Sequence, residues 1–295
     1  MYNFQVAILA SLPRCGLYLS FSLASNSAPG AADVRATLAR ITYDEARVVG
    51  IGDAVVQACD GTIAGIRSFT GMTHGVLAAP STQDDLWIWL SGNDRGALTL
   101  EARQLISDLK PVFEPHLRAD AFLYREGRDL SGYVDGTENP QGNDARRTAI
   151  LHGTDSHLDG SSFVAVQQWV HDLSSFEAHS QRQRDHIIGR TQKGDIELED
   201  APESAHVKRT AQESFTPDAF MVRRSMPWSE KDRMGLMFVA FSCSFDAFEA
   251  QLRRMLGMED EIPDALFSFT QPISGAYYWC PPVHNGALDW RALGA

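Results

Sequence analysis

The sequence predicts an α+β protein made of two ferredoxin-like halves, each with strands and helices in the order βαββαβ. Three observations support this fold class: short alternating apolar segments typical of strands, helical patterns that follow them, and the same order of both in each half. The distance along the chain from residues 16–23 to 86–92 is about the same as that from residues 163–170 to 235–242. We therefore expect an internal duplication whose two antiparallel sheets face each other.

The first half opens with GLYLSFSL, residues 16–23, which alternates and is rich in Leu, Tyr and Phe, as in a half-buried strand. A polar break follows at residues 25–30. The next segment places Val34, Leu38 and Ile41 on one face, which predicts a helix.

A second strand and helix complete the first half. The strand is LWIWLSG, residues 86–92, and residues 94–110 form an amphipathic helix that ends before Pro111.

The second half repeats this pattern. We predict a strand, a polar helix and two further strands, in that order, at residues 163–170, 175–188, 219–225 and 235–242. The last helix has the best-marked ends. Asp246 and Glu249 have the spacing of a capping box at its start, and Gly257 can end it in the left-handed conformation.

The chain divides into an N-terminal half at residues 1–130, a polar linker at 131–162 and a C-terminal half at 163–295. Ligand pockets favour the junctions between domains or sheets. We therefore expect the linker to border a pocket built mainly by the C-terminal half.

The composition argues against several classes of partner. The chain has 295 residues, 44% of them hydrophobic and 22% charged, so it can bury a large core. Its net charge of −12 opposes binding to nucleic acid or to anionic membranes, and its apolar runs are far shorter than the roughly 20 residues that span a bilayer. The four cysteines lack the paired spacing of a zinc site or a disulfide framework. No basic region precedes the apolar N-terminus, which Pro13 and Arg14 interrupt, so we expect a cytoplasmic protein.

Two stretches contain residues that could do chemistry. The first, SGYVDGTENP at residues 131–140, carries Asp135, which taken alone is typical of a turn. The second, residues 190–228, carries one histidine, His206. One histidine cannot make a zinc site, but it suffices as the axial ligand of a haem, because the porphyrin supplies the other four nitrogens. Taken alone, His206 is equally typical of a solvated loop.

Five motifs occur in order along nearly the whole chain: GYVDGTENP, IGRT, SAHVKRT, VRRSMPW and PDALFSFTQPISGAYYWCPP. This set resembles the dye-decolorizing peroxidase family, and in particular its cytoplasmic branch without a signal peptide. The resemblance implies a haem peroxidase of the dimeric α/β-barrel-like superfamily, with two ferredoxin-like halves and one haem b per chain. It also implies a homo-oligomer that uses hydrogen peroxide together with dyes or other small aromatic reductants.

The resemblance implies roles for the polar residues of these motifs. His206 would be the axial ligand of the haem iron, and Asp264 would accept the other ring N–H. Asp264 is also typical of a helix start after Pro263. Asp135 would act first as base and then as acid, moving a proton between the two oxygens of the peroxide.

Arg223 would stabilise the charge that develops on the leaving oxygen, and Ser225 would reach the same water network. Side chains two positions apart on a strand share a face, so Arg223 and Ser225 point together while Arg224 points away. A strand register shifted by one residue would put Arg224 in the place of Arg223.

The remaining residues would hold the cofactor. Arg190 would pair with a haem propionate, although its position is also typical of an exposed surface charge. Gly136 and Thr137 would lie beside the macrocycle. Leu236 and Phe238 alternate onto one strand face, and they either wall the pocket or belong to the core.

Together these residues indicate an enzyme that reduces hydrogen peroxide at a His-ligated ferric haem and oxidises dyes or phenolic donors in one-electron steps. Bulky donors could pass electrons through surface aromatic residues, for which the candidates are Tyr133, Trp169, Trp228, Tyr277, Tyr278 and Trp279. One alternative is a haem carrier or iron-releasing haem-processing protein with the same fold, but a carrier has no need of Asp135 and Arg223. The other is a non-haem hydrolase with Asp135 as general base, which the missing G-x-S-x-G motif disfavours.

Overall fold

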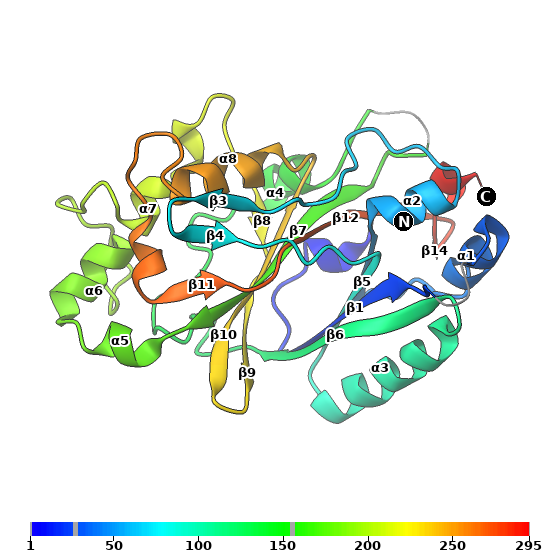
Figure 1. Ribbon diagram of the computed structural model, residues 1–295, viewed down its shortest axis with the longest axis horizontal. Coiled ribbons are helices and arrows are strands. Elements are labelled where there is room, and N and C mark those ends of the chain that lie inside the picture. The colour runs from blue at the N-terminus through cyan, green and yellow to red at the C-terminus, as the bar shows by residue number, and fades with distance from the viewer. Residues whose placement is uncertain (1, 26–28, 154–156, 295) are drawn as a thin grey trace.

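Eight antiparallel strands close into a barrel in this computed structural model, which describes residues 2–25, 29–153 and 157–294 (Figure 1). The ring closes because β7 pairs with β12 at one edge and with β10 at the other. In order around the barrel, the strands are β7 (Ser162–His171), β12 (Ala276–Cys280), β2 (Arg47–Ile51), β5 (Leu86–Gly92), β1 (Cys15–Leu23), β6 (Phe113–Phe122), β9 (Met226–Glu230) and β10 (Arg233–Ser242). Parts of the predicted polar break (26–28) and of the predicted linker (154–156) lie outside the described residues.

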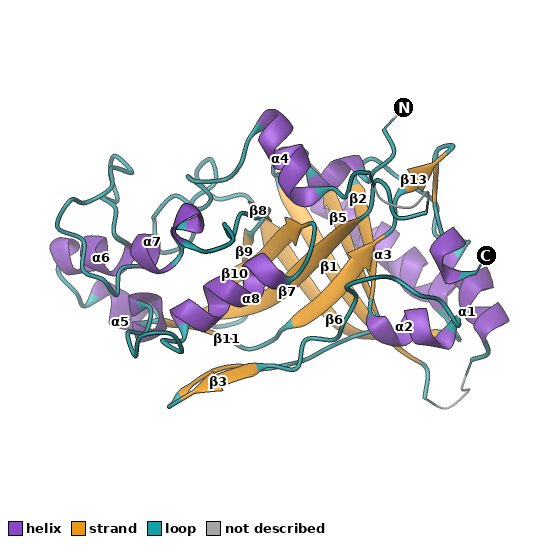
Figure 2. Ribbon diagram, turned by 90° about the horizontal axis from the view of Figure 1, so that it is seen from above, coloured by secondary structure: helices purple, strands orange, loops and turns teal. Residues whose placement is uncertain are grey.

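Helices and short strands surround the barrel (Figure 2). The helices are α1 (Ala31–Leu38), α2 (Asp53–Ala58), α3 (Arg95–Leu109), α4 (Gly142–Ala149), α5 (Leu173–Glu177), α6 (Gln181–Ile188), α7 (His206–Arg209) and α8 (Asp246–Met255). The short strands are β3 (Met72–His74), β4 (Leu77–Ala79), β8 (Val222–Arg223), β11 (Thr270–Pro272), β13 (Val283–His284) and β14 (Ala287–Leu288). Within the described ranges, no helix has both the length and the apolar character needed to cross a bilayer.

Each half of the barrel has the same strand order. Counted along the chain within each half, the strands lie in the order second, third, first, fourth: β2-β5-β1-β6 and β9-β10-β7-β12. The halves meet at two joins with one residue pair each, Trp279 with Ile51 and Ala121 with Trp228. The two sheets expected to face each other are thus also joined edge to edge, which pairs backbone groups that an open sheet would leave free.

The strands predicted at residues 16–23, 86–92, 163–170 and 235–242 are confirmed as β1, β5, β7 and β10, and the helix predicted at 94–110 is confirmed as α3. Two other predictions are wrong. The polar helix at residues 175–188 is two helices, because the chain breaks after α5 and Ser180 then caps α6 by accepting the Gln183 N–H. The strand at residues 219–225 is reduced to β8, because only Val222 and Arg223 of this stretch pair with β10. The pairing with β10 resumes at Met226, in β9.

Helix α8 differs from the prediction at its start and agrees with it at its end. Phe245 occupies the position before the helix and makes no side-chain cap. Asp246 and Glu249 instead bind the guanidinium of Arg67, at 2.8 and 3.0 Å. The predicted capping box is therefore wrong, because both carboxylates have a cationic partner outside the helix. Gly257 has a left-handed φ of 76° and ends the helix as predicted.

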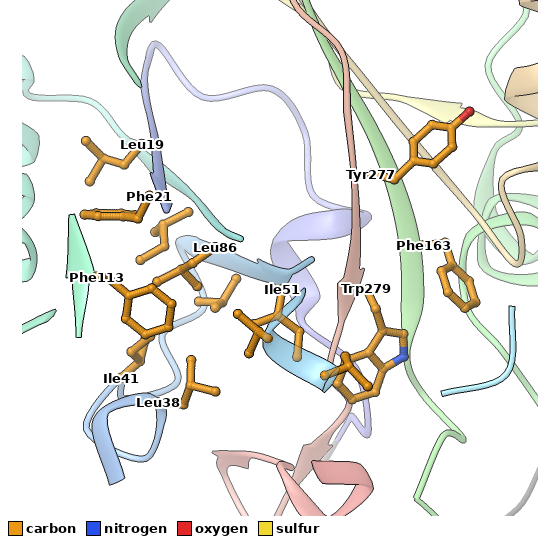
Figure 3. Packing of buried hydrophobic residues seen from close by; sticks show 14 of the residues in the cluster. Leu19, Phe21, Leu38, Ile41, Ile51, Leu86, Phe113, Phe163, Tyr277 and Trp279 are labelled. Carbon is orange, nitrogen blue, oxygen red and sulfur yellow. The ribbon is translucent and has the colours of Figure 1, made fainter. Parts of the chain in front are cut away.

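One layer of the core lies between the outer face of the barrel and the helices (Figure 3). Leu19 and Phe21 of β1 pack in this layer with Phe113 of β6 and Leu38 of α1. Ile41 is buried here too, although α1 already ends at Leu38. The predicted apolar face is thus longer than the helix that carries it.

The inside of the barrel is filled by aromatic side chains. The cluster there takes residues from all eight barrel strands. Trp89, Tyr18, Trp87 and Tyr278 stack in that order, with 5.8, 6.3 and 6.0 Å between neighbouring ring centroids. Because side chains occupy the interior, the outer faces of the sheets are the surfaces on which a ligand site can form.

Candidate active site

A cavity of about 300 Å³ lies on the outer face of the C-terminal half of the barrel. Gln167 and Trp169 of β7, and Leu236 and Phe238 of β10, form one wall, and they alternate along their strands with residues of the barrel interior. Side chains of α7, α8 and the loop before α4 form much of the remaining lining. Among the described residues, every lining residue lies at or after Asp129 in the chain.

His206 is the first residue of α7 and lines the cavity with a side chain that is one-third exposed. Its Nδ1 lies 2.7 Å from Oδ2 of Asp264, whose side chain is fully buried. The other oxygen of Asp264 accepts the Leu266 N–H at 2.8 Å and so caps a short 3-10 helix. Asp264 therefore has both arrangements considered from the sequence, a partner of His206 and a helix start. Nε2 of His206 has no hydrogen-bond partner within the described part of the chain.

Asp135 lies in a tight loop. Arg128 and Val134 bridge across this loop just before Asp135. Gly136 then turns the chain with a φ of 81°, and a Cβ at this position would lie only 2.8 Å from Nδ2 of Asn139. The glycine is needed for both its conformation and its lack of a side chain.

Asn139 fixes the Asp135 loop to β8. Its amide accepts the backbone N–H of Arg223 at 2.8 Å and donates to the backbone carbonyl of Arg223 at 2.9 Å. Asn139 was not predicted to be a site residue, although it belongs to the GYVDGTENP motif. Its position within that motif is the signal that could have identified it.

Burial raises the pKa of the Asp135 carboxyl above the ordinary value for aspartate. The guanidinium of Arg223 is the strongest influence that lowers this pKa, and Asp129 raises it further. His206 and the Ser225 hydroxyl lower it slightly. Asp135 therefore binds a proton more tightly than an exposed aspartate does.

The three residues that follow Val222 have different surroundings. Arg223 lines the cavity, and Arg224 does not. Arg224 instead donates to the Arg223 carbonyl at 3.0 Å, and burial lowers its pKa. Ser225 is buried close to Asp135, but it does not line the cavity and its hydroxyl makes no hydrogen bond of normal geometry within the described residues. Of the two arginines, the structure brings Arg223 to the cavity.

Arg190 lies at the edge of the cavity and is paired with carboxylates. It binds Glu138 at 2.6 Å and Glu197 at 3.1 Å, and its side chain is only 11% exposed. Thr137 also lines the cavity and donates to Asp195 at 2.5 Å, while Gly136 lies beside it. The exposed surface charge considered for Arg190 is therefore wrong, because the residue is mostly buried among acidic partners.

A second histidine–carboxylate pair, which was not predicted from the sequence, lines the cavity. Nε2 of His171 lies 2.9 Å from Oδ1 of Asp129. Asp129 lies just before the GYVDGTENP motif, and His171 is the last residue of β7. Neither position carries a sequence signal of its own, because the two residues meet only in the folded chain.

The aromatic residues considered as surface electron donors are all buried. Their exposed fractions run from 0% for Trp279 to 6% for Trp169. Trp169 and Tyr133 line the cavity, and the other four lie in the core. None of the six can therefore be a surface residue as expected, because neighbouring elements cover all of their side chains.

Residues 126–285 match the protein family described as Dyp-type peroxidase, C-terminal. The dye-decolorizing peroxidase of Mycobacterium tuberculosis is 29% identical to this chain, over 94% of this chain and 88% of its own length. The dye-decolorizing peroxidase of Rhodococcus erythropolis is 27% identical, over 93% and 85%.

Solved structures of similar proteins have the same fold. A dye-decolorizing protein from V. cholerae has a TM-score of 0.83 and 27% identity, covering 94% of this chain and 96% of that one. A variant of DypB from Rhodococcus jostii RHA1 in complex with heme has a TM-score of 0.84 and 25% identity, covering 93% and 95%. Because the family match covers more than half of the sequence, including the whole lining of the cavity, this chain belongs to the Dyp-type peroxidase family, whose members are haem-dependent peroxidases.

Proposed function

We propose that this enzyme reduces hydrogen peroxide with one haem b per chain, held by His206, and with Asp135 and Arg223 as its acid–base and charge-stabilising residues. One observation carries the proposal: a carboxylate-held imidazole, a buried carboxyl and an arginine line the same cavity. A hydrolase with a histidine–aspartate pair would place a serine or cysteine nucleophile against Nε2 of His206, and no such hydrogen bond is present among the described residues.

The residues present suit a haem. A buried carboxylate that accepts the Nδ1 proton leaves Nε2 as the metal-binding nitrogen and raises its basicity. The apolar side chains of Leu236, Phe238 and Leu252 provide a surface for a flat macrocycle. When bound, a haem would supply a redox-active iron at which the peroxide bond is broken.

Asp135 would move the proton that this reaction requires. It would take a proton from one oxygen of the peroxide and return it to the other, which would leave as water. The residue must be ionised to begin, and its raised pKa keeps the proton available for the second transfer.

Arg223 would stabilise the negative charge on the departing oxygen, because a guanidinium keeps its proton at all working pH values. Its backbone is held at both N–H and C=O by Asn139. We propose that this clamp fixes the position of Arg223 relative to Asp135. Ser225 would act only through the water that joins these two groups.

We further propose that Arg190 pairs with a haem propionate. Its guanidinium binds Glu138 and Glu197 in the described structure, and a propionate would be a third carboxylate of the same kind. Gly136 and Thr137 would lie beside the macrocycle, where a larger residue at 136 would collide with Asn139.

Electrons would come from dyes, phenols or other small aromatic donors in one-electron steps, as the names of the relatives suggest. The homo-oligomer and the cytoplasmic location predicted from the sequence are also part of this proposal. They are tested by light scattering and by fractionation of cells that produce the protein.

We also propose that the two halves, residues 1–130 and 163–295, are ferredoxin-like units joined by a linker at 131–162. The identical strand order in the two halves supports this, and so does the helix between the third and fourth barrel strands of each half, α3 in one and α8 in the other.

The test is the visible spectrum of the protein loaded with haem, before and after peroxide. A Soret band that changes with peroxide is expected, and Asp135→Asn should keep the band but react about 10²–10⁴-fold more slowly. Failure to bind haem would refute the proposal. A bound haem that does not react with peroxide would support the carrier instead.

A further inference from the structure

The proposed function leaves one buried histidine–carboxylate pair on the cavity wall without a role. His171 and Asp129 have side chains that are 5% and 14% exposed. Nε2 of His171 lies 2.9 Å from Asp129, and Nδ1 lies 2.6 Å from Oγ1 of Thr270. The imidazole is thus held at both nitrogens, so its orientation is fixed.

Asp129 and Asp135 belong to the same tight loop. The backbone N–H of Asp129 donates to the Tyr133 carbonyl at 2.9 Å, and the N–H of Asp135 donates to the Gly127 carbonyl at 3.0 Å. These bonds hold the two ends of the loop side by side. Both carboxyl groups line the cavity, so two like charges face one small volume.

The surroundings shift the pKa values of the Asp129 and Asp135 carboxyl groups in opposite directions. Burial raises the pKa of Asp129, but the hydrogen bond and charge of His171, together with the N–H and hydroxyl of Ser131, outweigh it and lower that pKa. Asp129 therefore stays ionised, and its charge is one of the influences that raise the pKa of Asp135.

The charged groups that face Asp135 come from three elements. Arg223 faces it from β8, His206 from α7, and Asp129 from its own loop. His171 of β7 faces Asp129, and the guanidinium of Arg128 is turned toward backbone carbonyls instead. Asp129 is the only one of these groups that opposes the ionisation of Asp135 within the described residues.

We propose that Asp129 and His171 are positioning residues that set the pH range in which Asp135 acts as a base. Asp129 holds a fixed negative charge near Asp135, and His171 offsets that charge by donating its Nε2–H. The inference rests on the proposed role of Asp135 and adds a regulator of its ionisation.

The proposal predicts shifts of opposite sign for the two partners. Asp129→Asn removes the negative charge but keeps an acceptor for the Ser131 N–H. The pH midpoint at which Asp135 ionises should therefore fall by about one pH unit. His171→Gln removes the imidazole that offsets Asp129, so the midpoint should rise. If Asp129 and His171 had only a structural role, both substitutions would shift the pH midpoint in the same direction.

The experiment measures fluoride binding to the ferric haem-loaded protein as a function of pH, by visible absorption. Fluoride is taken up together with a proton, so its pH midpoint reports the ionisation of Asp135 without turnover. The matched control is Asp200→Asn, which removes an exposed carboxylate 3.5 Å from His186. The control should keep the wild-type midpoint.

Opposite shifts in Asp129→Asn and His171→Gln would support the proposal. Suppose that Asp135→Asn abolishes the midpoint, as the proposed function requires. Unchanged midpoints in Asp129→Asn and His171→Gln, or shifts of both in the same direction, would then overturn the proposal. If His171→Gln does not fold, Asp129→Asn decides alone: a midpoint below the control supports the proposal, and an unchanged one overturns it. If Asp135→Asn leaves the midpoint intact, the proposed function itself fails, and this inference fails with it.

Discussion

At His206, one buried carboxylate determines what the imidazole can bind. Asp264 gives one oxygen to His206 and the other to the Leu266 N–H, so it cannot turn away. An imidazole held in this way presents the same nitrogen to the cavity at all times. Because the orientation of the ring is already fixed before a metal binds, binding at that nitrogen costs less entropy.

His206→Ala should therefore lose most of the bound haem, because no other described lining residue is a histidine with a free Nε2. The measurement is Soret absorbance per chain after reconstitution and gel filtration. His179→Ala is the control, since His179 is a partly exposed histidine outside the cavity. Equal haem content in the two variants would contradict the ligand assignment.

Arg223→Leu should slow the reaction with peroxide by about 10²–10³-fold, because one charge-stabilising donor is lost. Arg224→Leu should keep the wild-type rate, since Arg224 does not line the cavity. Stopped-flow absorbance gives both rates. If Arg224→Leu were the slow variant, the side-chain directions in β8 would have to be reversed.

Residue by residue, the sequence identified side chains that lie in recognisable motifs, such as Asp135 and His206. It could not identify pairs that only the fold brings together. Asn139 and Arg223 are 84 residues apart, and Asp129 and His171 are 42 residues apart. Strand alternation put Arg223 and Arg224 on opposite faces but left open which of them faces the site, because that depends on the strand register, and the structure brings Arg223 to the cavity.

Among the elements, helix α8 forms part of the cavity wall, because Phe248, Leu252 and Met255 of its buried face line the cavity. Its end is fixed by backbone bonds: the N–H groups of Gly257 and Met258 donate to carbonyls in the last turn, at 2.9 and 3.0 Å. Gly257 therefore helps to hold α8 in the position in which it lines the cavity.

Gly257→Ala should lower the free energy of unfolding by about 1–2 kcal/mol, because an alanine is strained at a φ of 76°. Its Cβ would also lie 3.1 Å from the backbone nitrogen of Pro263. Gly75→Ala is the control, since Gly75 has a φ of 57° and open space around it. Urea unfolding should show a smaller loss for the control, and equal losses would mean that the contact with Pro263 has no effect.

Apolar periodicity predicted which faces of the elements are buried, but not where the elements are interrupted. The predicted helix at 175–188 has a break at Ser180, whose capping role depends on the local backbone. Asp246 and Glu249 have the spacing of a cap, yet a distant arginine, Arg67, binds both. Such competition between local and tertiary partners is not visible in a short sequence pattern.

In the whole molecule, the barrel depends on two joins that have little backbone pairing. Each contributes one residue pair, so side-chain packing must hold the halves together. Trp279 is completely buried at one join, and Trp228 is buried at the other. These two side chains are expected to supply much of the stability of the closed barrel.

Trp279→Ala should cost about 3–5 kcal/mol of unfolding free energy, because it leaves a large cavity at a join with few backbone bonds. Leu100→Ala, at an exposed position of α3, should change it by less than about 0.5 kcal/mol. Thermal and urea unfolding of both variants provide the measurement. A loss in Trp279→Ala as small as in the control would show that the join is held by other contacts.

The duplicated order of strands could be predicted from spacing along the chain, whereas closure of the barrel could not. Closure depends on Ile51 meeting Trp279 and on Ala121 meeting Trp228. Trp228 and Trp279 lie in two of the five motifs, but no motif marks their partners Ala121 and Ile51, and the edge strands that meet belong to different halves. Pairing between distant edges is decided by the twist of the whole sheet.

Apart from Asp129, the described lining of the cavity takes no residue from the N-terminal half, residues 1–130. Random substitutions in the two halves should therefore have different effects. Substitutions in strands β1 to β6 should change mainly the yield of folded protein, while those between Asp129 and Thr270 should also change turnover per folded molecule. A library confined to one half can thus be screened for expression, and a library confined to the other for new donors.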